Sequence, residues 1–313
     1  MGIRILSSGL LTTVQDLGRT GYQRTGISPS GAVDRKALKI ANILVGNQPG
    51  EGALEMTMTG ASMEFTEPDV VAVTGGDFEA TLNGIRMPMY AAVPVRTGDV
   101  LALGPAKNGC RAYAAFAGGL GVPVMMGSKS TNLKCGIGGF EGRRLKADDE
   151  LPFSAPCAEL DKMELRRVDL PDLPGPEALV RVVLGPQDDY FTQAGIRTLL
   201  SEAWTVTNRC DRMGCALDGT PIEYRTKADI ISDGIPFGAV QIPSDGKPIV
   251  MLSDRQTTGG YAKIAAVISS DLPVFAQRRP GDRIRFQKIS MREAQRISLM
   301  EEKKLRALRR RLL

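Results

Sequence analysis

Short apolar runs separated by turn residues dominate the sequence. Runs such as 70–75 (VVAVTG), 110–119 (CRAYAAFAGG), 179–185 (LVRVVLG) and 282–289 (DRIRFQKI) have the length and the β-branched or aromatic content of strands. Glycine and proline interrupt them at the interval that is typical of barrels and sandwiches. The pattern predicts an all-β protein, mainly β with a few helices.

Two segments have a helical period instead. Residues 31–45 place an apolar face on one side and end at Gly46, a suitable C-cap. Residues 290–313 begin with Ser290 and Glu293 in capping-box spacing and continue with leucines three or four residues apart. We expect the first helix to cover a barrel. The second is predicted to be a basic amphipathic C-terminal helix. The apolar face of the first segment consists of Val33, Ala37, Ile40, Ala41 and Leu44.

A chain of 313 residues is long enough for two domains of ordinary size. The stretch DLPDLPGPEA at 169–178 is rich in proline and changes the composition sharply, which predicts a linker. We therefore expect a first unit at 1–168, a linker at 169–178, a second unit at 179–289 and the C-terminal helix at 290–313.

Composition narrows the class of protein. Hydrophobic residues make up 42% of the chain, which excludes disorder for most of it. The sequence has five cysteines without a CxxC pair and no histidine, so we expect no metal and reduced thiols. Neither a signal peptide nor a membrane-spanning run is present, which predicts a cytoplasmic protein without a membrane partner.

The net charge of +5 comes from the C-terminal segment. Residues 290–313 hold eight of the 40 Lys/Arg and three of the 35 Asp/Glu, so the rest of the chain carries 32 of each. A neutral body argues against a nucleic-acid partner. The tail could bind an acidic partner or lie on its own domain with a solvated basic face, and the second interpretation is favoured.

Four windows combine glycine with arginine, aspartate, serine or threonine: 12–34, 118–149, 208–219 and 253–261. Such windows can form backbone nests with charged anchors for a carboxylate, a phosphate or a ureido group, or simply polar turns. None matches a P-loop or a dinucleotide fingerprint. The residues alone therefore indicate a small polar ligand.

The lack of histidine excludes Ser-His-Asp and Cys-His nucleophile systems. Any chemistry must use carboxylates, Arg, Lys, Tyr or groups of the substrate. Three aspartates lie close in sequence to arginines, and structural salt bridges are the alternative to catalysis for each pair. These pairs are Asp16 with Arg19, Asp211 with Arg212, and Asp254 with Arg255.

The wording and order of these windows resemble the family of the bacterial 5-oxoprolinase C subunit, also called allophanate hydrolase subunit 2. The motifs are TTVQDLGRTGYQRTGISPSGAVD, GVPVMMGSKSTNLKCGIGGFEGRRLKADD, RMG, IPFGAVQIPSDGKPIVMLSDRQTTGGYAKIA and LPVFAQRRPGDRIRF. The resemblance covers roughly residues 3 to 288 and extends to half of the carboxyltransferase domain of urea carboxylase. The chain departs from the family pattern at Cys215 and Ala216, where an aromatic and a basic residue are expected.

The resemblance implies two cyclophilin-like β-barrel units and a hetero-oligomer with the A and B subunits of the oxoprolinase. With ATP as the cofactor, that complex cleaves the lactam 5-oxo-L-proline to L-glutamate, and this chain is expected to be inactive alone. One alternative is the carboxyltransferase half of a biotin-dependent urea or amide carboxylase. Another is a non-catalytic binder of a kinase-inhibitor protein that resembles the B subunit.

We expect the site to be shared between the windows. Asp254, Arg255 and Arg212 are the candidate catalytic residues, with Asp254 and Arg255 positioning the substrate. Hydroxyls, amides and backbone N–H groups are expected to hold its carbonyl or carboxylate. Arg212, Ser128, Ser130 and Thr131 are expected to face the same cavity as Asp254. The candidate substrate-binding residues are Gln15, Arg19, Ser128, Ser130, Thr131, Gln256, Thr257, Thr258, Gly259, Gly260 and Tyr261.

Overall fold

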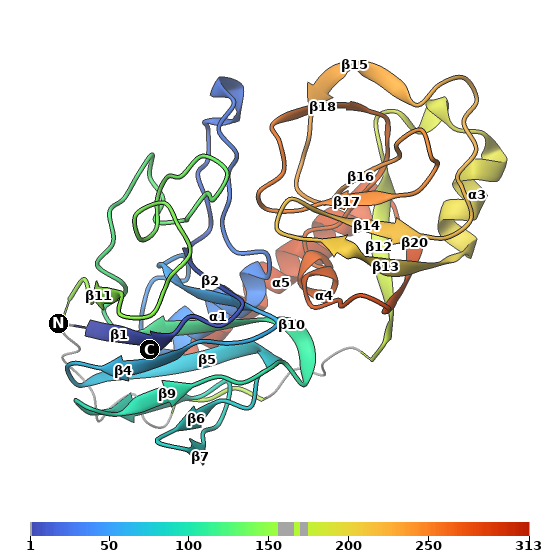
Figure 1. The fold of residues 1–313 in the computed structure, drawn as a ribbon. Coiled ribbons are helices and arrows are strands. Elements are labelled where there is room, and N and C mark those ends of the chain that lie inside the picture. The colour runs from blue at the N-terminus through green and yellow to red at the C-terminus, as the bar shows by residue number, and fades with distance from the viewer. Residues whose placement is uncertain (1, 156–165, 170–174, 313) are drawn as a thin grey trace. The chain divides into compact units, whose positions relative to one another are not determined.

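The structure is a computed structural model that describes residues 2–155, 166–169 and 175–312. Half of the predicted linker, residues 170–174, lies outside the described residues. The chain forms two compact units (Figure 1). The first unit contains residues 1–20, 30–173 and 304–313, and the second contains residues 21–29 and 174–303. No pattern in the sequence indicated that residues 21–29 would belong to the second unit or that residues 304–313 would belong to the first.

Two sheets build the first unit, and all their strand pairs are antiparallel. The six-stranded sheet has the order β11 (Glu150–Pro152), β1 (Gly2–Ser7), β4 (Ser62–Phe65), β9 (Val100–Ala102), β6 (Thr81–Leu82) and β7 (Ile85–Arg86). The five-stranded sheet has the order β2 (Leu11–Gln15), β3 (Ala53–Thr57), β10 (Asn108–Phe116), β5 (Asp69–Asp77) and β8 (Ala92–Val95).

Strand β5 shows why its apolar run is continuous. Val71 and Val73 belong to a core that also contains residues from the six-stranded sheet. Val70 and Ala72 belong to a second cluster, together with buried residues of α1 (Arg35–Leu44). Because side chains alternate between the faces of a strand, a strand that is buried on both faces needs apolar residues throughout.

Helix α1 confirms the helix predicted for 31–45. Asp34 caps its N-terminus by accepting a hydrogen bond from the Ala37 N–H at 2.9 Å. The predicted apolar face is buried. Leu305, Leu308 and Leu312 of the C-terminal helix α5 (Met291–Leu312) pack against the same cluster. This helix also begins as predicted, since Ser290 Oγ accepts from the Glu293 N–H at 3.1 Å.

The second unit is a closed seven-stranded barrel. Its order is β12 (Glu177–Leu184), β19 (Lys263–Val267), β16 (Ala239–Gln241), β17 (Ile249–Met251), β14 (Gly214–Asp218), β13 (Ala203–Cys210) and β20 (Arg283–Lys288). The ring closes through β12 and β20, which are parallel. A separate two-stranded sheet consists of β15 (Asp229–Gly234) and β18 (Thr258–Tyr261).

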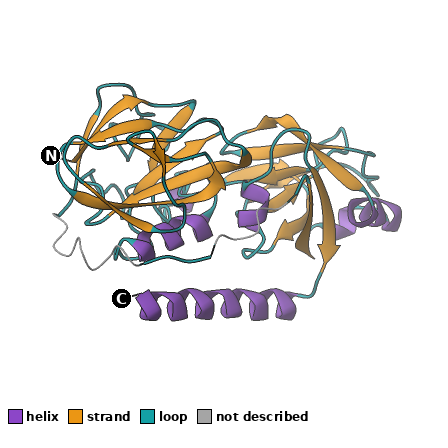
Figure 2. Ribbon diagram, turned by 90° about the horizontal axis from the view of Figure 1, so that it is seen from below, coloured by secondary structure: helices purple, strands orange, loops and turns teal. Residues whose placement is uncertain are grey.

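Strands predominate in both units (Figure 2), which confirms the all-β class. Helices α3 (Gln193–Ser201) and α4 (Leu272–Ala276) and the short 3-10 helices η1 (Gln23–Thr25) and η2 (Asp188–Tyr190) complete the second unit. No helix among the described residues is long and apolar enough to cross a membrane.

The expectation of reduced thiols does not hold for one pair. Cys210 and Cys215 lie opposite each other on β13 and β14, with 4.0 Å between their Cα atoms, and form a disulfide. The absence of CxxC spacing did not exclude such a bond, because a strand-to-strand turn with four intervening residues brings these sulfurs together. The disulfide encloses the turn that carries Arg212.

Candidate functional site

The polar cluster of the first unit is organised by Asp16, which follows β2. Its Oδ1 accepts hydrogen bonds from the Gly18 N–H at 2.7 Å and from the Ser128 hydroxyl at 2.7 Å. The Ser130 hydroxyl also donates to Oδ1, and the Lys129 N–H donates to Oδ2 at 2.6 Å. A carboxylate with several donors is held in one orientation. Asp16 is thus the residue that fixes the Ser128–Ser130 segment, a role that the sequence did not assign to it.

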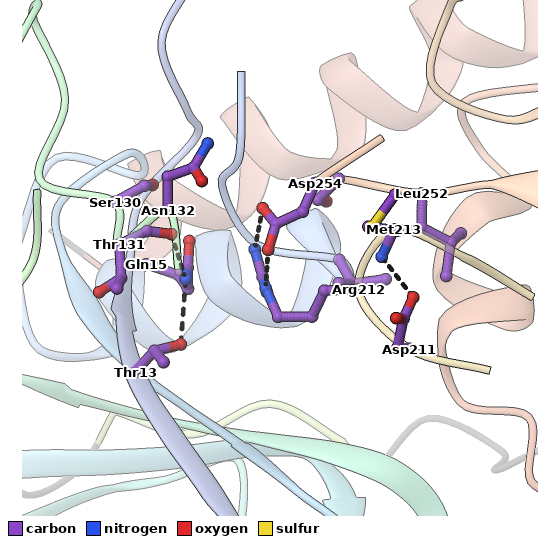
Figure 3. Close-up of polar contacts among 12 residues, drawn as sticks. Thr13, Gln15, Ser130, Thr131, Asn132, Asp211, Arg212, Met213, Leu252 and Asp254 are labelled. Carbon is purple, nitrogen blue, oxygen red and sulfur yellow. Dashed lines mark hydrogen bonds and ion pairs between the residues drawn. The ribbon is translucent and has the colours of Figure 1, made fainter. Parts of the chain in front are cut away.

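Gln15 and Thr131 join the same cluster. The Gln15 amide donates to Thr13 Oγ1 at 3.0 Å and to the Thr131 carbonyl at 3.1 Å (Figure 3). In turn, the Thr131 hydroxyl donates to the Val14 carbonyl at 3.0 Å. These side chains are buried and bind one another and the backbone, and their role in binding a substrate stays a prediction.

Arg19 is also buried and donates to the Ser130 carbonyl. Gly138 has a positive φ of 70°, and a Cβ at this position would overlap the Arg19 guanidinium. Gly139, with φ of 55°, makes room in the same way for the Thr131 side chain. The glycines of window 118–149 therefore allow close packing of polar side chains.

In the second unit, Arg212 and Asp254 form a buried ion pair. Arg212 Nε donates to Asp254 Oδ2 at 2.8 Å, and Nη2 donates to Oδ1 at 3.1 Å (Figure 3). The side chains are 5% and 9% exposed. Asp211 instead caps its own turn by accepting from the Met213 and Gly214 N–H groups. For Arg212, the ion pair found in the structure crosses between windows rather than joining neighbours in sequence.

Arg255 follows Asp254 in the sequence and is also buried, but its contacts are different. Its guanidinium donates to the Ile235 carbonyl at 2.8 Å and to the Leu252 carbonyl at 3.2 Å. It also lies over the Phe237 ring, 5.6 Å from the centroid. These contacts give Arg255 a structural role in addition to the positioning role predicted for it.

The rest of window 253–261 is partly strand. Thr258–Tyr261 forms β18 and pairs with β15. A Cβ at Gly259 would lie 2.7 Å from Ile235 Cδ1, so close packing explains this glycine. Thr257 and Thr258 remain accessible, and Tyr261 is 40% exposed. The Oε1 atom of Gln256 is buried without a hydrogen-bond partner among the described residues.

Segment 21–29 contributes to this unit as well. The Ser28 hydroxyl donates to the Ser253 carbonyl at 3.4 Å, which links window 12–34 to window 253–261. The structure thus brings Arg212, Asp254 and Ser28 into the second unit. Gln15, Arg19, Ser128, Ser130 and Thr131 gather in the first. A single pocket shared by all windows stays a prediction.

Sequence reasoning missed Lys263, which is buried at the start of β19 and paired with Asp233. Its signal was a lysine inside the apolar strand sequence AKIAAV, where a charged residue is unusual. Among the described residues, no group of three or more His, Cys, Asp or Glu side chains is placed to hold a metal ion.

Comparison with known proteins identifies related chains. Residues 25–288 match the family described as carboxyltransferase domain, subdomain A and B. The chain is 39% identical to the C subunit of 5-oxoprolinase from Escherichia coli, over 93% of both chains. It is 35% identical to the protein of the same name in Haemophilus influenzae, over 98% of both. Among solved structures, Kluyveromyces lactis urea carboxylase matches 98% of this chain with a TM-score of 0.89 at 29% identity, and the match spans 29% of that longer protein.

Proposed function

The chain belongs to the carboxyltransferase-domain family that includes the 5-oxoprolinase C subunit, and from this membership we propose that it is the C subunit of an ATP-dependent 5-oxoprolinase. In the proposed complex with the A and B subunits, the lactam of 5-oxo-L-proline is opened to give L-glutamate. The observation that carries the proposal is the identity of 39% with the E. coli protein across nearly the whole of both chains.

The second-unit cluster supports a substrate-binding role. Arg212 holds the Asp254 carboxylate in place, and a carboxylate has lone pairs left to accept the lactam N–H. The accessible hydroxyls of Thr257 and Thr258 are donors for the lactam carbonyl, whose negative charge grows as the ring opens. A fixed acceptor with neutral donors three and four residues further along the chain suits a small cyclic amide.

ATP belongs to the proposed reaction, but the described clusters do not fit a triphosphate. Arg212 is paired with Asp254, and Arg255 and Arg19 donate to backbone carbonyls. A triphosphate needs several cations and N–H groups directed at it. We therefore assign lactam binding to this chain and derive no step through ATP.

Reconstitution tests the proposal. The purified chain with 5-oxo-L-proline and ATP should release no glutamate, because the chain has no histidine and the carboxylates of Asp16 and Asp254 are already bound. Adding the A and B subunits should restore glutamate release. Turnover by the chain alone would contradict the partnership. A complex that works with the E. coli relative but not with this chain in its place would overturn the proposed function.

A second candidate is carboxyl transfer from carboxybiotin to urea or another amide. The structural match to urea carboxylase favours it. Bound biotin would supply the carboxyl group, and the hydroxyls of Thr257 and Thr258 fit its ureido carbonyl as well as a lactam. Incorporation of labelled bicarbonate into urea, in the presence of a biotin carboxylase and a biotinylated carrier, would distinguish this reaction from lactam cleavage.

A further inference from the structure

Lys263 is a buried cation with few acceptors. Its side chain is 3% exposed, and in the described part of the chain its ammonium donates to one group, Asp233 Oδ2, at 2.9 Å. An ammonium has three N–H donors, and burying a charge is costly unless it is paired and hydrogen-bonded. The ammonium can therefore bind another acceptor in addition to Asp233, or a stronger acceptor in its place.

Its partner is in a very different environment. The Asp233 side chain is 54% exposed and lies on β15, where Ile231 is 94% exposed. The hydrogen bond from Lys263 lowers the pKa of Asp233, so the carboxylate is ionised at neutral pH. An exposed carboxylate is already largely solvated, so it can move from the ammonium into water at little cost. The buried ammonium cannot reach water without unpacking β19. The pair is asymmetric, with a fixed cation and a replaceable anion.

Two amide side chains lie next to Lys263. Gln241, 1% exposed, lies opposite Lys263 in the pairing of β16 with β19, so the two side chains share a face. The Gln187 Oε1 atom accepts from the Lys263 backbone N–H at 3.2 Å, and its Nε2 lies 3.4 Å from Asp233 Oδ2. Gly259 of β18 lies opposite Asp233, and the structure has no space for a side chain at position 259. Gln241 and Gln187 thus supply amide N–H donors near Lys263 that can share a carboxylate with the ammonium.

We propose that Lys263 binds the carboxylate of a small anionic ligand, and that Asp233 is an internal competitor which occupies the ammonium until that ligand replaces it. On the proposed function, on which this choice of ligand rests, the ligand is 5-oxo-L-proline. Its lactam would occupy the neutral donors while its carboxylate binds Lys263. The ligand exchanges one carboxylate for another, so the buried charge stays paired throughout.

Binding to the full-length chain can be measured by calorimetry with 5-oxo-L-proline and with 2-pyrrolidinone, the same lactam without a carboxylate. Lys263→Met should weaken binding of 5-oxo-L-proline by about 30-fold or more, as expected for loss of a buried charge partner, and leave 2-pyrrolidinone unaffected. Asp233→Asn should strengthen binding of 5-oxo-L-proline, because the competitor is removed. Melting temperatures show whether each variant is folded.

Asp218→Asn is the matched control, since Asp218 pairs with the more exposed Lys247 at 2.6 Å in the same unit. It should not change binding. The inference is overturned if Asp233→Asn weakens binding, or if the wild-type chain does not prefer 5-oxo-L-proline over 2-pyrrolidinone. If reconstituted complexes fail to release glutamate but Lys263-dependent carboxylate binding is present, the inference stands and the proposed function falls.

Discussion

Arg212 and Asp254 are 42 residues apart in the chain, yet the guanidinium of one donates to both carboxylate oxygens of the other. Because both side chains are buried, removing either one leaves an uncompensated charge. Arg212→Met should therefore lower the free energy of unfolding by about 3–5 kcal/mol. Replacing both, as Arg212→Met with Asp254→Leu, should cost less than the single change.

Urea denaturation of Arg212→Met, Asp254→Leu and the double variant measures the coupling between the two side chains. Lys247→Met, which breaks the exposed pair with Asp218, should cost less than about 1 kcal/mol and serves as the control. Strictly additive losses in the double variant would show that the charges do not compensate each other.

Asp16 should be sensitive even to a conservative change. Asp16→Asn places an amide NH₂ group against donors from Gly18, Ser128, Lys129 and Ser130. We expect a loss of about 2–3 kcal/mol, since hydrogen bonds to a charged acceptor are the stronger kind. Thermal melting compares this variant with Ser128→Ala, which removes one donor and should cost less. Equal effects would mean that the carboxylate is not the organising group.

Arg255→Ala should lower stability as well as activity, because the side chain is buried and holds the Ile235 and Leu252 carbonyls. The Leu252 carbonyl keeps its hydrogen bond from the Arg255 backbone N–H, so the main cost is the Ile235 carbonyl, and leaving such a buried acceptor unsatisfied costs about 1–3 kcal/mol. Melting temperature and glutamate release by the reconstituted complex separate the two roles. An inactive variant with an unchanged melting temperature would assign Arg255 to the substrate alone.

Asp69 makes stability depend on pH. Burial at the start of β5 raises its pKa to about 7, with a smaller contribution from Glu67, and the Val70 N–H opposes the shift only in part. In the unfolded chain the group ionises near its ordinary value of 3.8. Between these values the unfolded state binds fewer protons, so stability falls as pH rises from about 4 to 7, by up to about 4 kcal/mol.

Asp69→Asn should flatten this slope and raise stability at pH 8, measured by denaturant unfolding across the pH range. Asp77→Asn, at the half-exposed end of the same strand, should leave the slope unchanged. A slope that survives in Asp69→Asn would place the titrating group elsewhere.

The Cys210–Cys215 disulfide closes a short loop, which in the chain-entropy account contributes about 2 kcal/mol. Dithiothreitol should lower stability by this amount, and the Cys210→Ser/Cys215→Ser variant should match the reduced protein. Cys135→Ser, at an exposed free cysteine, should behave as wild type. If dithiothreitol destabilises the double serine variant as well, the effect does not come from this disulfide.

Local patterns predicted local structure. The apolar stripe from Val33 to Leu44 predicted α1, and the run at 70–75 predicted β5, because both depend on which faces are buried. Helix α3 was missed, since its sequence QAGIRTLLS is short and holds a glycine. The Thr192 cap stabilises this helix, together with tertiary packing. Two helical turns are too short for the apolar period to predict that packing.

Long-range partners could not be predicted in the same way. Arg212 was predicted to face the same cavity as Asp254, but its ion pair was expected with its neighbour Asp211. The turn between β13 and β14 instead directs Asp211 to its own backbone and Arg212 to Asp254. The partner of Lys263 lies 30 residues away on another sheet. Such pairs depend on strand register and loop path, which a single sequence does not encode in any short window.

The exchange of segments between the units also constrains how the protein is made. The first unit includes residues 304–313, and Leu305, Leu308 and Leu312 cover the α1 cluster. During translation this cluster stays uncovered until residues 305–312 have left the ribosome, by which time all the strands of the second barrel have been synthesised. Fragments cut within 169–178 would each lack a part of their own fold, so they should be recovered together or not at all.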